Sequence, residues 1–275
     1  MTIQLPTYFI GHGGVSILFK PGYEPVHRDL REIGKEIKRM NPDGIVVTCG
    51  HFQSENDTIQ VNLKEPTEVW HDLSPAWKST FPHVFDYQYA HKSSRALGEK
   101  VLSHLKAQGI KAEGTERDLD HGVWVPFKLM FPEGDELEIP ILEVSTYAGN
   151  DLTAHIQLGR ALSKLGGNIL LIGSGMLSHN LAATREQSMD TTIPRYLEAA
   201  SSEALAAATI AERNEQFLAL QRYEGWEGAH PTEEHVLPLY VTLGVGQEMK
   251  EYKVFNKDQY IVGQSYFSFR LGALP

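Results

Sequence analysis

Three short apolar segments that run directly into glycine and histidine constrain the fold of this chain most strongly. Thr7–Ile10 leads into Gly11 and His12, Ile45–Thr48 leads into Cys49-Gly50-His51, and Asn168–Ile172 leads through Gly173-Ser174-Gly175 to His179. A short apolar run of this kind is typical of a buried strand. Glycine permits the sharp turn that follows such a strand. The pattern predicts three core strands, each with a histidine near its carboxyl end.

Helical segments are predicted between these strands. Apolar spacing and composition predict helices over residues 27–40, 93–108, 120–130, 152–165, 196–220 (one or two helices) and 235–243. Further strands are predicted over 110–113, 139–145 and 264–271, with possible short strands near 59–63. Residues 53–90 are otherwise irregular and predict a long functional loop. Alternating strands and helices indicate one α/β domain over residues 1–275, with a mostly parallel central sheet and helices on both faces.

Composition limits the kind of partner. The formal net charge is −10, and the absence of a dense basic block argues against nucleic acid. No segment reaches the roughly 18 apolar residues of a membrane span, and no signal peptide is evident. Cys49 is the single cysteine, so a disulfide within the chain is excluded and a buried structural thiol is predicted. We expect a cytoplasmic monomer or homodimer that binds a small molecule.

The stretch Gly228–Leu239 contains two histidines, His230 and His235, at a spacing of five. Five residues on a helix turn through roughly 500°, so one helix face cannot hold both. If a metal binds here, one of the two is a ligand and its partners come from elsewhere in the chain. Ligands of open α/β sheets bind beyond the carboxyl ends of the strands, where His12, His51 and His179 are predicted to lie. A site at these strand ends would use His, Asp or Glu, because one cysteine cannot make a cysteine-rich zinc site.

Other readings of the same residues are less favoured. Glu233 and Glu234 are expected to complement the dipole of a helix that starts there, although either could be a ligand. His230 is expected to orient a ligand or to cap the turn before Pro231. The segment Gly173-Ser174-Gly175 does not fit the serine-hydrolase elbow, and a dinucleotide or Walker fingerprint is absent after the first strand.

Five motifs occur in an order that is shared with a known family: Phe9–Gly13, Gly50–Phe52, Asp120–Trp124, Ser174–Asn180 and His230–Leu239. Together they resemble the class III (LigB-type) extradiol ring-cleavage dioxygenases, and within them the 4,5-DOPA extradiol dioxygenase-like branch. The resemblance covers nearly the whole chain. It implies one divalent metal held by His12, His51 and His235, with His179 and His121 as catalytic residues and no organic cofactor.

The resemblance also implies a reaction. A DOPA-like catechol would chelate the metal, and O2 would be inserted beside the diol to give a ring-opened semialdehyde. His179 would take and return a proton, and His121 would hydrogen-bond substrate or oxygen. Three imidazoles suit either Fe(II) or Zn(II), and only iron can exchange an electron with O2.

Residues of the irregular segment match the family in part. The pairs His71-Asp72 and Phe81-Pro82 imply a substrate pocket, but the stretch Leu73–Thr80 between them is longer than usual, and Gly14-Val15 replaces a usual Ser-Pro. The residues expected to line the pocket or support the site are His71, Phe81, Pro82, Tyr89, Trp124 and His230. For Trp124 and Tyr89, packing in the core or pocket wall is the alternative to a direct role.

Two other functions stay open at this point. The fold could serve as a metal- or partner-binding scaffold without catalysis, as in the related Memo-type proteins. Zinc-dependent hydrolysis would need Glu233 or Glu234 as a general base near the metal. The presence of His121 and His179 favours the dioxygenase.

Overall fold

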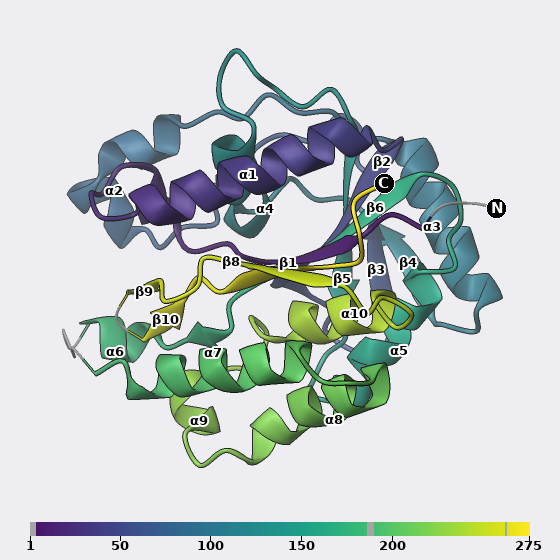
Figure 1. Cartoon of the computed structure of the whole chain (residues 1–275). Coiled ribbons are helices and arrows are strands. Elements are labelled where there is room, and N and C mark those ends of the chain that lie inside the picture. Colours follow the sequence, from purple (N-terminus) through teal and green to yellow (C-terminus); the bar gives the residue numbers. More distant parts are fainter. Residues whose placement is uncertain (1–3, 186–189, 262) are drawn as a thin grey trace.

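An eight-stranded sheet runs through the computed structural model, which describes residues 4–185, 190–261 and 263–275 (Figure 1). The strands in spatial order are β4 (Ala112–Thr115), β3 (Ile59–Asn62), β5 (Ile141–Thr146), β2 (Gly44–Gln53), β6 (Ile169–Gly175), β1 (Thr7–Gly11), β11 (Ser268–Leu271) and β8 (Tyr252–Phe255). The central strands β5, β2, β6 and β1 are parallel. Strand β3 is parallel to β4 but antiparallel to β5, and β11 is antiparallel to both its neighbours. The predicted mostly parallel sheet is confirmed.

Helices cover both faces of this sheet, also as predicted. Helices α1 (Glu24–Met40) and α4 (His121–Met130) pack on one face, and α3 (Arg95–Ala107), α5 (Leu152–Leu162) and α10 (Leu237–Val245) pack on the other. Helices α7 (Thr192–Leu205) and α8 (Ile210–Ala219) form a further layer below α10 (Figure 1). Strand β1 illustrates why its sequence is uniformly apolar: Tyr8 and Ile10 join the first core and Phe9 joins the second. Among the described residues, the helices are too short or too polar to cross a membrane.

The remaining elements are short and lie in the connections. They are η1 (Val15–Leu18), α2 (Ala76–Thr80), η2 (Pro82–Asp86), α6 (Leu181–Arg185), η3 (Leu220–Arg222) and α9 (Trp226–Ala229), with a small sheet of β7 (Ser178–His179), β10 (Gln264–Ser265) and β9 (Tyr260–Ile261). The predicted loop over residues 53–90 therefore contains β3, α2 and η2. The strand predicted over 264–271 is divided between two sheets, because β10 pairs with β7 while β11 pairs with β1.

Two differences from the sequence prediction change the surroundings of the histidines. Strand β2 continues to Gln53, so His51 lies inside the strand and not after it. At this place, between Thr48 and Gln53, the pairing of β2 with β5 shifts register. Helix α10 begins at Leu237, with Pro238 in its first turn, so His235 precedes the helix. The predicted helix at 196–220 is two helices, and Thr209 begins the second with a capping box.

Candidate active site

The carboxyl ends of β1, β2 and β6 meet at one edge of the sheet, and the segment before α10 closes over them. His12 follows β1, and its backbone N–H donates to the carbonyl of Gly175 at 3.0 Å. The carbonyl of His235 accepts from the Met176 N–H at 2.8 Å. Glycine is required where this segment approaches, since a Cβ at Gly175 would lie 2.2 Å from the His235 carbonyl oxygen and one at Gly50 would lie 3.0 Å from its Cα. These contacts bring His235 to the strand ends.

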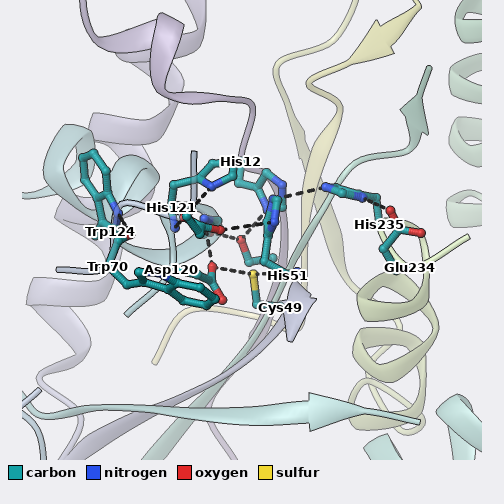
Figure 2. Close-up of polar contacts among 12 residues, drawn as sticks. His12, Cys49, His51, Trp70, Asp120, His121, Trp124, Glu234 and His235 are labelled. Atoms are coloured by element: carbon teal, nitrogen blue, oxygen red, sulfur yellow. Dashed lines mark hydrogen bonds and ion pairs between the residues drawn. The ribbon is translucent and has the colours of Figure 1, made fainter. Parts of the chain in front are cut away.

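Three histidine rings converge at this edge. His12, His51 and His235 each present a ring nitrogen, and the three nitrogens lie within 4.8 Å of one another. Nε2 of His51 lies 3.2 Å from Nε2 of His235 (Figure 2). Two imidazoles on one metal at about 2.0–2.1 Å hold their nitrogens about 2.8–3.4 Å apart at bond angles of about 90–110°. The separation of these two nitrogens therefore fits a shared cation.

Hydrogen bonds at Nδ1 set the tautomers of His12 and His235, and a carboxylate faces Nδ1 of His51. His12 Nδ1 lies 3.1 Å from Ser174 Oγ, which donates its own proton to the Gly122 carbonyl and so accepts from the imidazole. His235 Nδ1 donates to Glu234 Oε1 at 2.9 Å (Figure 2). His51 Nδ1 lies 3.5 Å from the Asp72 carboxylate. With their protons on Nδ1, His51 and His235 direct the lone pairs of their Nε2 atoms toward each other, an arrangement that a cation between them stabilises.

Burial favours the neutral form of His12 and His51, the form that metal coordination requires. It lowers the pKa of His12 and of His51 well below the usual range, and the surrounding histidines lower both further. Glu234 behaves in the opposite way: burial raises its pKa, but the hydrogen bond and charge of His235, together with the hydrogen bonds from the Glu234 backbone and Thr232, outweigh burial and lower the pKa to about 2. An anionic carboxylate thus accepts the Nδ1 proton of His235. The donor set fits a divalent metal that accepts nitrogen ligands, iron and zinc among them.

His121 is the first residue of α4, and Asp72 fixes it. The carboxylate of Asp72 accepts from the backbone N–H of His121 at 3.0 Å and from its Nδ1 at 2.8 Å. Burial raises the pKa of Asp72, but the hydrogen bonds from the side chain and backbone of His121 and the charge of His121, together with a backbone hydrogen bond at Asp72, outweigh burial and lower the pKa. The ring of His121 lies 4.0 Å from that of His51, between centroids. Asp72 therefore contacts both His121 and His51, which is one of the three converging histidines.

A buried polar layer supports this end of α4. Asp120 begins the helix, and its carboxylate accepts from the Gly122 N–H at 2.9 Å, from Cys49 Sγ at 3.1 Å and from Arg117 at 2.9 Å. Cys49 is fully buried, as predicted, and burial raises the pKa of its thiol. A Cβ at Gly122 would lie 2.5 Å from Cys49 Sγ and 2.9 Å from His51 Cδ2. The start of α4 is therefore in close contact with the converging rings.

His179 lies in β7, which pairs with β10 so that His179 is opposite Gln264. Its ring stacks on that of His235, with centroids 3.6 Å apart and planes 16° from parallel. Burial, with His235 beside it, lowers the pKa of His179 to about 3. The imidazole is neutral at physiological pH and can accept a proton.

All five histidines that the resemblance singles out, His12, His51, His121, His179 and His235, line one cavity of about 450 Å³. This volume suits a small-molecule ligand. The other walls come from segments far apart in the chain: Leu73, Ser74 and Trp77 from the irregular segment, Thr232 before α10, and Gln264 from β10. The predicted convergence of residues from separate strand ends is what the structure contains.

Five residues that were expected to line the pocket do not line this cavity. Trp124 is fully buried and donates its Nε1–H to the Trp70 carbonyl at 3.2 Å (Figure 2), so the packing alternative describes it. Tyr89 is buried and stacks on His91, and His71 packs between Phe85 and Trp124. Phe81 packs on Phe19 and Trp77, and Pro82 begins η2. The neighbours Asp72 and Trp77 face the cavity in their place.

The interpretation of Glu233 and Glu234 as partners of a helix dipole was wrong, because both precede α10 and each has a specific partner. Glu233 accepts from Trp226 Nε1 at 2.8 Å, and Glu234 accepts from His235. His230 ends α9, where its N–H donates to the Trp226 carbonyl. Its ring packs on Trp226, and within the described part of the chain its two nitrogens lack hydrogen-bond partners. His230 caps this turn and orients no ligand through a hydrogen bond.

The chain belongs to the LigB family. It matches the family described as the catalytic LigB subunit of aromatic ring-opening dioxygenase over residues 12–270. The fold is also that of an uncharacterized protein of Escherichia coli K12 of known crystal structure, with a TM-score of 0.70 and 22% identity over 98% of this chain and 100% of that one.

Curated relatives agree with the family assignment. A 4,5-DOPA dioxygenase extradiol of Beta vulgaris is 31% identical over 88% of this chain and 87% of its own length. A 4,5-DOPA dioxygenase extradiol-like protein of Schizosaccharomyces pombe is 30% identical over 78% of this chain and 71% of its own. The 4,5-DOPA dioxygenase extradiol of Escherichia coli is 27% identical over 89% and 87%.

Proposed function

We propose that this protein is an Fe(II)-dependent extradiol dioxygenase that cleaves the ring of a catechol with O2, that residues 1–275 form its single catalytic domain, and that it works in the cytoplasm. The observation that carries the proposal is the triad of His12, His51 and His235, which each present a ring nitrogen within 4.8 Å of the others while their Nδ1 atoms face Ser174, Asp72 and Glu234. Bound iron would supply the electron exchange with O2 and would acidify a chelating diol.

His179 acts as the proton acceptor for the substrate. It is a neutral imidazole at the cavity wall and stacks on His235, so its ring is held beside the metal ligands. An anionic, chelated diol next to it would stabilise its protonated form, and the same ring could later return the proton. The expected contribution is on the order of 10²–10⁴-fold in turnover.

His121 acts on the opposite side of the triad. Its Nδ1 donates to Asp72, which leaves Nε2 as the atom that can hydrogen-bond substrate or oxygen. The backbone N–H of His121 fixes the Asp72 carboxylate, so the ring cannot turn without breaking its Nδ1 hydrogen bond to an anchored acceptor. His121 is therefore held in place before any ligand binds.

Zinc-dependent hydrolysis is less well supported than ring cleavage. It needs a carboxylate that is free to act as a base on water. Glu233 accepts from Trp226, and Glu234 accepts from both His235 and Thr232. Both carboxylates already have structural partners.

Two variants and a control test the assignment of roles. Exchange of His235 for alanine should abolish stoichiometric metal binding, whereas His179→Ala should keep the metal and lose O2 uptake with catechols. His83→Ala, an exposed histidine away from the cavity, should alter neither. Metal content by mass spectrometry and O2 uptake by electrode are the measurements. Loss of metal in His179→Ala together with its retention in His235→Ala would reject these roles.

A further inference from the structure

The cavity has a second region, beyond the histidines, that is built by residues 72–77. Leu73, Ser74 and Trp77 from this segment line the cavity, and Trp77 comes from the short helix α2. Trp77 is half-buried and packs its ring against Phe81 at 5.5 Å between centroids. Leu181 and Met176 line the same cavity from the chain around β7. A ring that chelates at the triad would leave its substituent to contact these mostly apolar side chains.

The charged side chains of the cavity are carboxylates. Among the described residues that line the cavity, Asp72 and Glu234 are acidic and none is a lysine or an arginine. Asp72 faces the cavity from the side of His121, and Glu234 faces it from the side of His235. Each carboxylate accepts a hydrogen bond from an imidazole N–H, which holds it in place beside a ligand. A carboxylate on the ring substituent of a substrate would therefore meet negative charge on two sides.

The net charge of the occupied site would also disfavour a carboxylate on the substrate. Three neutral imidazoles leave a divalent cation with its full 2+ charge, and the two carboxylates offset it. A chelated catecholate then makes the cavity net negative. An additional carboxylate on the substrate adds to that charge, while an ammonium group reduces it. An aromatic face such as that of Trp77 also attracts cations and not anions.

We infer that this cavity selects catechols whose ring substituent is a cationic amine or an apolar group, and discriminates against a carboxylate substituent, with Trp77 as the specificity-determining contact. The inference rests on the proposed function, because it assumes that the diol chelates at the triad. A substituent with both an amine and a carboxylate, as in DOPA, falls between the two classes.

Three catechols of matched length test the preference: 4-(2-aminoethyl)catechol, 4-propylcatechol and 3,4-dihydroxyphenylacetate. Their dissociation constants are measured by calorimetry on the zinc-loaded protein, because zinc cannot exchange an electron with O2 and a bound catechol would not be turned over. The amine should bind about tenfold or more tightly than the acid, with the propyl compound between them or near the amine. Equal affinity for the three, or tighter binding of the acid, overturns the inference.

Variants of Trp77 and Ser74 test whether these residues determine the preference among ring substituents. Trp77→Ala should weaken the amine and propyl compounds about tenfold or more while leaving unsubstituted catechol within about twofold. Trp70→Ala removes an exposed tryptophan that does not line the cavity, and it should change none of the affinities. Ser74→Lys adds a cation at an exposed lining position and should narrow or reverse the ranking, whereas Ser74→Gln should not. Equal effects of Trp77→Ala on unsubstituted and substituted catechols would refute the role of Trp77.

Turnover separates this inference from the proposed function. If the iron-loaded protein consumes O2 with any of the probes but the affinities are unranked, the dioxygenase stands and the selectivity fails. If the three affinities rank as expected but the iron-loaded protein consumes no O2 with any probe, the inferred selectivity is supported and the proposed dioxygenase activity is refuted. If none of the catechols binds the zinc-loaded protein, both fail.

Discussion

We predict that the Glu234 carboxylate raises the metal affinity of the proposed site, although the three proposed ligands are histidines. Its Oε1 accepts the Nδ1 proton of His235 at 2.9 Å, and the side chain is only 25% exposed, so water can replace it only in part. Carboxylates that bind a metal-ligating histidine in this way contribute about 10–100-fold to metal affinity, or about 1.4–2.7 kcal/mol. Glu234→Gln keeps an acceptor but loses the charge, so we expect about a tenfold loss. Glu234→Ala loses both, so we expect about a hundredfold loss.

Zinc affinity measured by competition with a chromophoric chelator gives these numbers directly. The matched control is Glu233→Gln, one residue away, whose partner is Trp226 and not a histidine of the triad. It should stay within about twofold of the parent. The reasoning is refuted if Glu234→Ala binds zinc as tightly as the parent, or if Glu233→Gln loses as much as Glu234→Gln.

Two further predictions concern packing and pH. Gly122→Ala would place a Cβ 2.5 Å from Cys49 Sγ and 2.9 Å from His51 Cδ2, so zinc affinity should fall at least about tenfold and unfolding free energy by about 1–3 kcal/mol. Glu198 has its pKa raised to about 7, mainly by burial, so the stability that it contributes is complete below about pH 4.5 and is lost as the pH rises through 7. The stability of the parent relative to Glu198→Gln should therefore fall by about 2–3 kcal/mol between pH 4.5 and 8, measured by chemical denaturation.

Each of these predictions has a control variant. A Cβ at Gly14 meets open space although Gly14 lines the cavity, so Gly14→Ala should keep its zinc affinity; an equal loss in both variants would contradict the packing argument. Glu203→Gln changes an exposed carboxylate on the same helix as Glu198 and should show no comparable pH trend. A flat pH profile for the Glu198→Gln difference would show that burial does not shift this group.

The strands and their histidines could be predicted because the signal is local. An apolar run such as Thr7–Ile10 can be buried on both faces only in the centre of a sheet, and the glycines beside His12 mark where that run turns. The sheet then brings the ends of β1, β2 and β6 together. The apolar pattern over Gln264–Leu271 was predicted as one strand, because periodicity does not reveal that its two halves pair with different sheets.

The residues that orient the histidines could not be assigned from sequence alone. Ser174 meets His12, and Asp72 meets His121, only because strands or segments 49 or more residues apart come together. Glu234 is next to His235, but whether it hydrogen-bonds the imidazole or interacts with a helix dipole depends on where α10 begins. The helix begins at Leu237, two residues after the predicted start at 235. The pocket-lining predictions failed for the same reason: His71 is adjacent to Asp72 in sequence, yet only Asp72 faces the cavity.

O2 uptake by the protein reconstituted anaerobically with Fe(II) tests the central claim most directly. We predict one iron per chain and consumption of one O2 per catechol, with the yellow absorbance of a ring-opened semialdehyde rising in step, and no uptake when zinc replaces iron. A filled metal site that consumes no O2 with any catechol, including the amine and propyl probes, would contradict the assignment of this histidine site to ring cleavage.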